Sequence, residues 1–97
     1  MDNRKIAQKL IDYAHYLEAR EANVFRVRAV RRAAETVLGL DQPVADLLVA
    51  EGRAGLEELP GIGPRLSSTL EELVRTGELR SMSGDERSDV AQRSLSG

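Results

Sequence analysis

The residues best suited to chemistry lie in a short run of glycine and proline near the middle of the chain. Gly61 and Gly63 stand two apart between Pro60 and Pro64, and the missing Cβ atoms let another backbone approach closely. The amides of Gly63 and of the first residues of a helix starting at Pro64 have no acceptor within that helix, and the helix dipole adds partial positive charge there. Arg65 follows directly. The segment therefore predicts a phosphate-binding site.

The residue between the two glycines is Ile62, which we expect to be buried and to anchor the turn on the rest of the fold. The same pattern of glycine and proline is also typical of a plain tight turn between two helices. Taken alone, the turn leaves both interpretations open.

The elements that position this turn are predicted to be helices. Leu and Ala dominate the sequence, and no run alternates in the manner of a strand. Apolar spacing and capping residues place helices over residues 3–20, 23–38, 43–51, 54–59 and 64–76, with Asp2 and Asn23 as N-caps and with Gly39, Gly52 and Gly77 at helix ends. The expected fold is an all-α compact bundle of four to five helices over residues 1–80, followed by a flexible Ser/Gly-rich tail over residues 81–97.

Side chains on the first two helices give further expectations. Leu38 completes the apolar stripe of the second helix, and Phe25 is expected to act as a hydrophobic staple at its start. Tyr13 and Tyr16 cannot both point inward, so one is expected to be exposed. His15 is expected at the surface.

Composition and charge exclude several classes of function. The 97 residues contain no cysteine and one histidine, which excludes disulfides, thiolate metal sites and multi-histidine clusters. The net charge of −2 hides an asymmetry, because residues 1–34 hold eight Lys or Arg and four Asp or Glu, whereas the remainder holds six and twelve. No leader and no membrane span is recognisable. We expect a cytoplasmic protein, associated with the nucleoid in a bacterium, without a membrane partner.

Two stretches of the sequence carry a family resemblance. The string LPGIGPRLSSTLEELVRTGEL resembles the helix-hairpin-helix motif of DNA repair proteins and polymerases. Upstream, FRVRAVRRAAETVLGL resembles the second helix of the N-terminal (8 kDa-like) domain of the beta-like, or family X, DNA polymerases. The resemblance implies a four-helix domain whose hairpin binds the sugar-phosphate backbone of one strand, without reading bases, next to a 5′-phosphate at a gap.

The resemblance also implies which residues bind. In the hairpin they are Gly61, Ile62, Gly63, Arg65, Leu66 and Ser67, and on the second helix Arg26, Arg28, Arg31 and Arg32. A monovalent cation, Na⁺ or K⁺, would be held by the backbone carbonyls of Glu57, Leu59 and Ile62. No cofactor is required.

Departures from the family pattern argue against catalysis. The lysine that forms a Schiff base in the family's deoxyribose-phosphate lyases is replaced by Thr69, and the family's tyrosine on the second helix by Val30. The only lysines in the chain are Lys5 and Lys9, and arginine stays protonated and is a poor nucleophile. No Asp-x-Asp pair of a polymerase occurs. The chain is therefore predicted not to be an enzyme.

The predicted function is sequence-independent binding of DNA, as a single strand or a gapped duplex, through backbone phosphates in DNA repair. One alternative is a protein-interaction module that forms a homodimer or joins a polymerase or repair partner, because helix-hairpin-helix elements also pair with each other. Residual deoxyribose-phosphate lyase activity is a second alternative.

Overall fold

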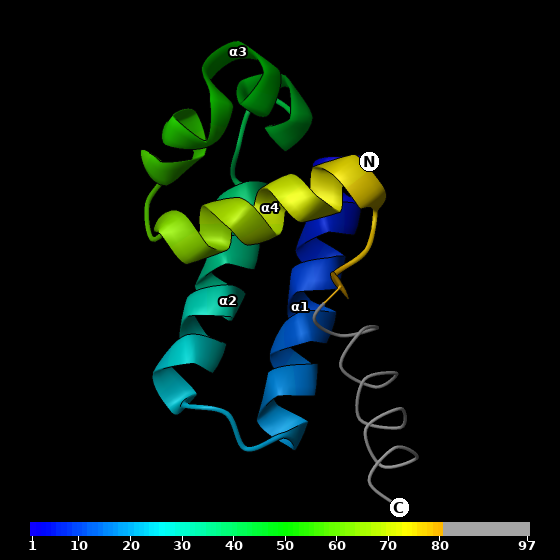
Figure 1. The fold of residues 1–97 in the computed structure, drawn as a ribbon, viewed down its shortest axis with the longest axis vertical. Helices are drawn as coiled ribbons and strands as arrows, with labels where there is room; N and C mark the ends of the chain where they lie inside the picture. Colours follow the sequence, from blue (N-terminus) through cyan, green and yellow to red (C-terminus); the bar gives the residue numbers. More distant parts are fainter. Residues whose placement is uncertain (81–97) are drawn as a thin grey trace, which may run out of the picture.

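The computed structural model describes residues 1–80, which form four helices and no strand. They are α1 (Asn3–Ala19), α2 (Val24–Leu38), α3 (Val44–Glu57) and α4 (Pro64–Thr76). Figure 1 shows α1 and α2 side by side and antiparallel, with α4 crossing one end of this pair and α3 lying beyond α4. The predicted all-α fold is confirmed. The predicted tail, residues 81–97, lies outside the described residues.

Most helix ends follow from local capping. The Asp2 Oδ1 atom accepts a hydrogen bond of 2.8 Å from the Lys5 amide, and Asn23 Oδ1 accepts one of 2.8 Å from the Phe25 amide. Each bond satisfies an amide that has no acceptor within its helix. At the other end of the chain Gly77 closes α4 with a φ of 79°. These three helix ends were predicted and are confirmed.

Gly52 divides α3 into two helical segments. Its φ of 68° and ψ of −167° lie outside the helical region, in a conformation that is easily reached only by glycine. The predicted helix end at Gly52 is confirmed, but the two predicted short helices follow one another directly and form a single kinked element. The kink lets the second segment of α3 turn back toward α4.

The core is built from one side of each helix. Its fully buried larger side chains are Ile6, Leu10, Val30, Val37, Val44, Leu56, Leu70 and Leu73. Two expectations about the core were wrong, since the exposed fraction of Leu38 is 55% and that of Phe25 is 72%. Phe25 lies two positions before buried Val27, and residues two apart on a helix do not face the same way. Leu38 lies four positions after buried Ala34 but is the last residue of α2, so its exposure follows from its place at the helix end and not from its spacing.

A side chain from α1 caps the beginning of α3. Asn3 Nδ2 donates to the carbonyl of Gln42 at 2.9 Å, and Asn3 Oδ1 accepts from the Val44 amide at 2.9 Å. Pro43, the N-cap residue of α3, has no side-chain acceptor to offer. Asn3 therefore supplies the missing cap from another helix and fastens α3 to α1. None of the helices among residues 1–80 has the length and apolar character needed to span a bilayer.

Replacing Asn3 should destabilise the fold through this cap. In Asn3→Ala both hydrogen bonds are lost, and we expect the free energy of unfolding in urea to fall by about 1 to 2 kcal/mol. Arg4→Ala, at an exposed neighbouring position on α1, should change it by less than about 0.5 kcal/mol. Equal effects of the two substitutions would contradict the capping role.

Candidate nucleic-acid interface

The hairpin between α3 and α4 is a tight turn anchored by Ile62. The Ile62 amide donates to the Leu59 carbonyl at 3.1 Å, and the Ile62 side chain is only 3% exposed. Gly61 has a φ of 78°, which places it in the left-handed region that favours glycine. The turn thus buries its apolar residue, as predicted, and leaves the glycine backbone on either side at the surface.

Backbone amides without acceptors collect around this turn. The first amide of α4 to make a helical bond is that of Ser67, which donates to the Gly63 carbonyl at 2.9 Å. The amides of Gly61, Gly63, Arg65 and Leu66 donate to no atom within residues 1–80. Gly63 is the N-cap of α4 and has no side chain that could satisfy them. These four N–H groups are therefore free for an anion, and those of Gly63, Arg65 and Leu66 lie at the positive end of the α4 dipole.

Two side chains from α2 lie against the turn. Thr36 Oγ1 donates to the Pro60 carbonyl at 3.0 Å, which fastens the beginning of the hairpin to α2. One helical turn earlier, Arg32 packs against Gly61, because a Cβ atom placed on that glycine would lie 3.4 Å from both Cδ and Nε of Arg32. Nε belongs to the guanidinium, so positive charge lies beside the free amides.

Ser67, in the first turn of α4, links the two helices that flank the hairpin. This residue is fully buried, and its hydroxyl lies within hydrogen-bonding distance of Glu57 Oε2 (3.0 Å) and of the Pro64 carbonyl (2.9 Å). Leu66 is buried as well. Of the hairpin residues predicted to bind DNA, Ile62, Leu66 and Ser67 can thus contribute only backbone atoms, whereas Arg65 is exposed.

The four arginines predicted to bind DNA differ in their surroundings on α2. Arg28 and Arg32 are exposed, lie one helical turn apart and line the side of α2 that meets the hairpin. Arg31 instead forms an ion pair of 2.8 Å with Glu18 of α1. Arg26 Nη2 donates to the hydroxyl of Tyr13, also on α1, at 3.2 Å. The contacts with α1 therefore separate Arg26 and Arg31 from the two arginines nearest the turn.

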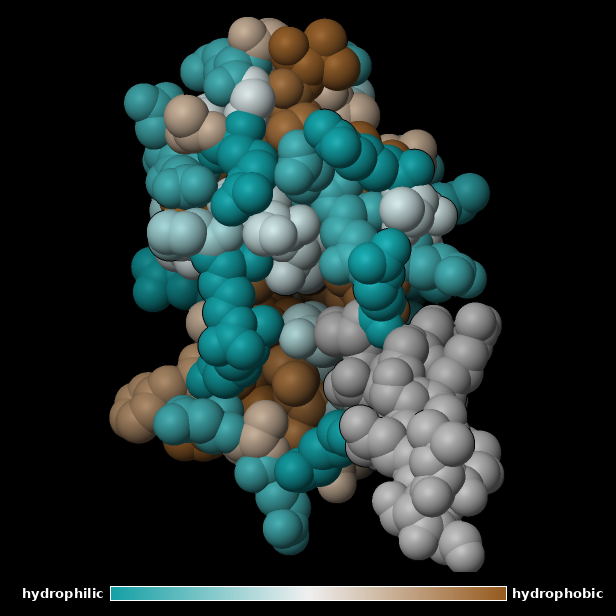
Figure 2. All heavy atoms as spheres, viewed as in Figure 1, coloured by the Kyte–Doolittle hydropathy of each residue, from teal (hydrophilic) through white to brown (hydrophobic). Residues whose placement is uncertain are grey.

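Phe25 continues the line of Arg28 and Arg32, because the spacings of three and four keep these side chains on one side of α2. We call Arg28 and Arg32 the basic stripe of α2, and the exposed ring of Phe25 lies at the end of this stripe. On the face drawn in Figure 2, hydrophobic surface also gathers over the half of α2 that α4 leaves uncovered, with hydrophilic side chains above it. The signal for this feature was present in the sequence, because Phe25 stands off the apolar stripe of its helix.

The expected cation ligands are three backbone carbonyls at the end of α3 and in the turn. The carbonyl of Leu59 accepts the bond from the Ile62 amide, while those of Glu57 and Ile62 accept no backbone hydrogen bond within the described part of the chain. No group of three or more His, Asp or Glu side chains among residues 1–80 could hold a metal ion.

Thr69 stands on the second turn of α4, where the resemblance placed the lyase lysine. Its hydroxyl donates to the Arg65 carbonyl at 3.1 Å, along the helix itself. The two lysines lie on α1, Lys5 exposed and Lys9 half-buried. Residue 69 thus offers a hydroxyl that bonds to its own helix, and no amine.

A helix, a glycine turn and a second helix with open N-terminal amides define a helix-hairpin-helix domain. Residues 1–79 match the helix-hairpin-helix domain family, and the chain belongs to that family, the one that contains the 8 kDa domains of beta-like DNA polymerases. This confirms the resemblance found in the sequence. No curated protein matches the chain. Domains of this kind are in general modules that bind DNA without sequence specificity, and the 97 residues contain no polymerase domain.

The two hairpin glycines should respond differently to alanine. Gly61→Ala forces a left-handed φ on a residue with a Cβ atom, and we expect a loss of about 1 to 2 kcal/mol in the free energy of unfolding. Gly63 has an ordinary extended backbone, and a Cβ atom there meets nothing within 4 Å. Gly63→Ala should therefore unfold in urea as the unchanged protein does. A strongly destabilised Gly63→Ala protein would contradict this geometry.

Proposed function

We propose that the chain binds the phosphate backbone of DNA without sequence specificity, through the hairpin and the adjoining side of α2. The observation that supports this most directly is the cluster of four free amides beside Arg32 and Arg65 at a turn without Cβ atoms. Such donors suit phosphate oxygens and carry no information about bases. Membership of a family of general DNA-binding modules points the same way.

The affinity should be modest. The hairpin and the arginines of α2 can contact about two to four phosphates, which corresponds to a dissociation constant in the range of roughly micromolar and a shallow dependence on salt. The net charge of −2 lowers the affinity further. The acidic residues are concentrated after residue 34, so the basic stripe of α2 is the side from which DNA approaches with least repulsion.

A gap or a single-stranded stretch is the form of DNA that suits this surface best. The exposed ring of Phe25 ends the stripe of Arg28 and Arg32, and an unpaired base can stack on an aromatic ring in a way that a paired base cannot. A terminal 5′-phosphate has more charge than an internal one and fits the amides at the start of α4. Gaps with 5′-phosphates are intermediates of DNA repair, which is the biological context that we propose.

A monovalent cation belongs to the same proposal. Backbone carbonyls are ligands that K⁺ takes in proteins, and those of Glu57 and Ile62 have no hydrogen-bond donor within residues 1–80. With Leu59 they would hold Na⁺ or K⁺ close to the free amides. A bound cation would place further positive charge where the DNA strand passes.

Binding is tested by fluorescence anisotropy with labelled DNA at low salt. We expect the chain to bind gapped, 5′-phosphorylated duplex more tightly than intact duplex. Gly63→Ala should weaken binding at least fivefold without loss of stability, because its Cβ atom obstructs only a strand that closely approaches the turn. Arg65→Gln should weaken binding by a similar factor through the loss of one phosphate contact.

The matched control is Arg75→Gln, which removes the same charge near the other end of α4, where Arg75 pairs with Glu71 at 3.1 Å. It should leave the affinity within about twofold of the original. Absence of binding to any of the DNA forms, or equal effects of Arg65→Gln and Arg75→Gln, would refute binding through the hairpin.

We further infer that the chain has no lyase activity, because Thr69 supplies no amine for a Schiff base. Borohydride reduction in the presence of DNA carrying a 5′-deoxyribose phosphate should yield no covalent adduct. An adduct that disappears in Lys9→Arg but persists in Lys5→Arg would assign the reaction to α1 and overturn this inference. Thr69→Lys supplies the missing amine and serves as the positive comparison.

A further inference from the structure

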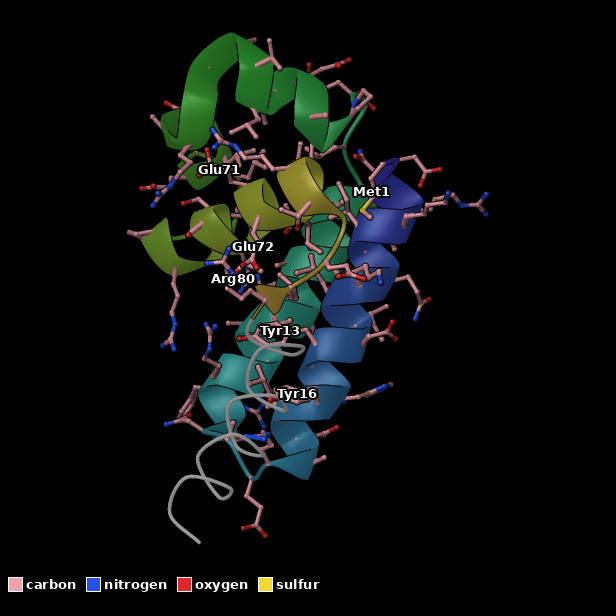
Figure 3. All side chains as sticks on the ribbon, turned by 45° about the vertical axis from the view of Figure 1, so that its right-hand side comes forward. Met1, Tyr13, Tyr16, Glu71, Glu72 and Arg80 are labelled. Atoms are coloured by element: carbon pink, nitrogen blue, oxygen red, sulfur yellow. The ribbon has the colours of Figure 1, made fainter. Side chains whose placement is uncertain are left out.

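Tyr13 and Arg26 form a contact between α1 and α2 that the hairpin does not explain. Arg26 Nη2 donates to the Tyr13 hydroxyl at 3.2 Å, and the Arg26 Cζ atom lies 5.8 Å from the centroid of the Tyr13 ring. The same side chain thus bonds to the edge of the tyrosine and lies over its face. Figure 3 shows Tyr13 and its neighbour Tyr16 on α1, along the half of the helix that α4 does not cross.

The tyrosine in this contact has little freedom to move. Tyr13 is 6% exposed. The rings of Tyr13 and Tyr16 are stacked, with centroids 6.3 Å apart and planes inclined by 21°. The sequence predicted that the two tyrosines would not both point inward, and the structure places Tyr16 half-buried at the edge of the core beside buried Tyr13. A fixed ring and a fixed hydroxyl restrict the conformations open to the Arg26 side chain.

Arg31 and Arg26 are both held by α1, but the partner of Arg31 is charged and that of Arg26 is neutral. The partner of Arg31 is the carboxylate of Glu18 at 2.8 Å, which offsets its charge. A phosphate would have to compete with that carboxylate. Tyr13 holds Arg26 with a neutral hydroxyl and an aromatic face, so the guanidinium is positioned and keeps its full positive charge. Its remaining N–H donors stay available to a phosphate.

We propose that Tyr13 is a positioning residue that holds Arg26 ready for a backbone phosphate, on the side of α2 that meets α1. This inference rests on the proposed DNA binding and adds a residue to it from a helix outside the motif. A strand bound at the hairpin then has two supports along α2: the exposed pair Arg28 and Arg32 beside the turn, and Arg26 farther from it. Arg31 takes no part while it is paired with Glu18.

The size of the effect follows from side-chain entropy. Immobilising a long side chain on binding costs roughly 0.5 to 1.5 kcal/mol, and a side chain that is already held avoids most of that loss. Removing the tyrosine hydroxyl should therefore weaken DNA binding about three- to tenfold. The effect should vanish when Arg26 itself is replaced, because Tyr13 acts only through it.

The test is a double-mutant cycle of Tyr13→Phe and Arg26→Gln, read by anisotropy with gapped, 5′-phosphorylated DNA at low salt. Tyr13→Phe keeps the buried ring and removes only the hydroxyl. We expect a three- to tenfold loss in the otherwise unchanged protein and no additional loss in the Arg26→Gln background. Glu18→Gln is the companion variant, and it should tighten binding about twofold or more by releasing Arg31 from its carboxylate.

The cycle separates positioning from a general loss of structure. A loss from Tyr13→Phe that is the same in both backgrounds would refute positioning, since it would act without Arg26. An unchanged affinity in Tyr13→Phe, while Gly63→Ala and Arg65→Gln still weaken binding, would refute this inference and leave the proposed function intact. If the unchanged protein binds none of the DNA forms, both proposals are wrong.

Discussion

The binding surface depends on the burial of a single side chain, that of Ile62. Ile62 is the middle residue of the hairpin, and burying an isoleucine contributes about 1.5 to 3 kcal/mol. Burial of Ile62 holds the turn in place while the backbone on either side stays at the surface. Without this burial, the unpaired amides would favour a turn in which they find acceptors. Bonds from Thr36 to the Pro60 carbonyl and from Ser67 toward Glu57 hold the two sides of the turn. The free donors are thus fixed before any ligand arrives.

The partners of each arginine on α2, and not the number of arginines, decide where positive charge is available to a ligand. Four of them occur within seven residues, and no acid lies among them. In the fold one is neutralised by Glu18, one is held by a tyrosine, and two are exposed beside the hairpin. The four arginines of this basic segment therefore differ in how much of their charge is free to attract a ligand. The charge that this surface presents to a ligand follows from geometry that the net charge of the chain does not reveal.

The sequence predicted whatever depends on neighbours along the chain. Asp2, Asn23 and Gly77 act within one helical turn, so their roles could be recognised from spacing alone, and the same holds for the hairpin and the break at Gly52. Contacts between distant positions could not be recognised in this way. The cap that Asn3 supplies to α3 spans 41 residues, and the separation of the α2 arginines depends on how α2 is rotated against α1. The error at Phe25 has another origin, because its spacing from Arg28 and Arg32 already placed it off the apolar stripe of α2.

The contact between Asn3 and Val44 joins positions far apart in the sequence, and this separation bears on the order in which the helices assemble. The α1–α2 pair is joined by a short connection, and Tyr13 and Arg26 meet across only 13 positions, so this pair closes at little entropic cost. The bond that the Val44 amide donates to Asn3 spans 41 positions and needs a loop about three times as long. Folding should therefore begin with the helical pair that carries the arginines, and the hairpin should be mounted on it afterwards. The bond from Thr36 to the Pro60 carbonyl spans 24 positions, so the hairpin and its free amides should be fixed on the helical pair before Asn3 caps α3.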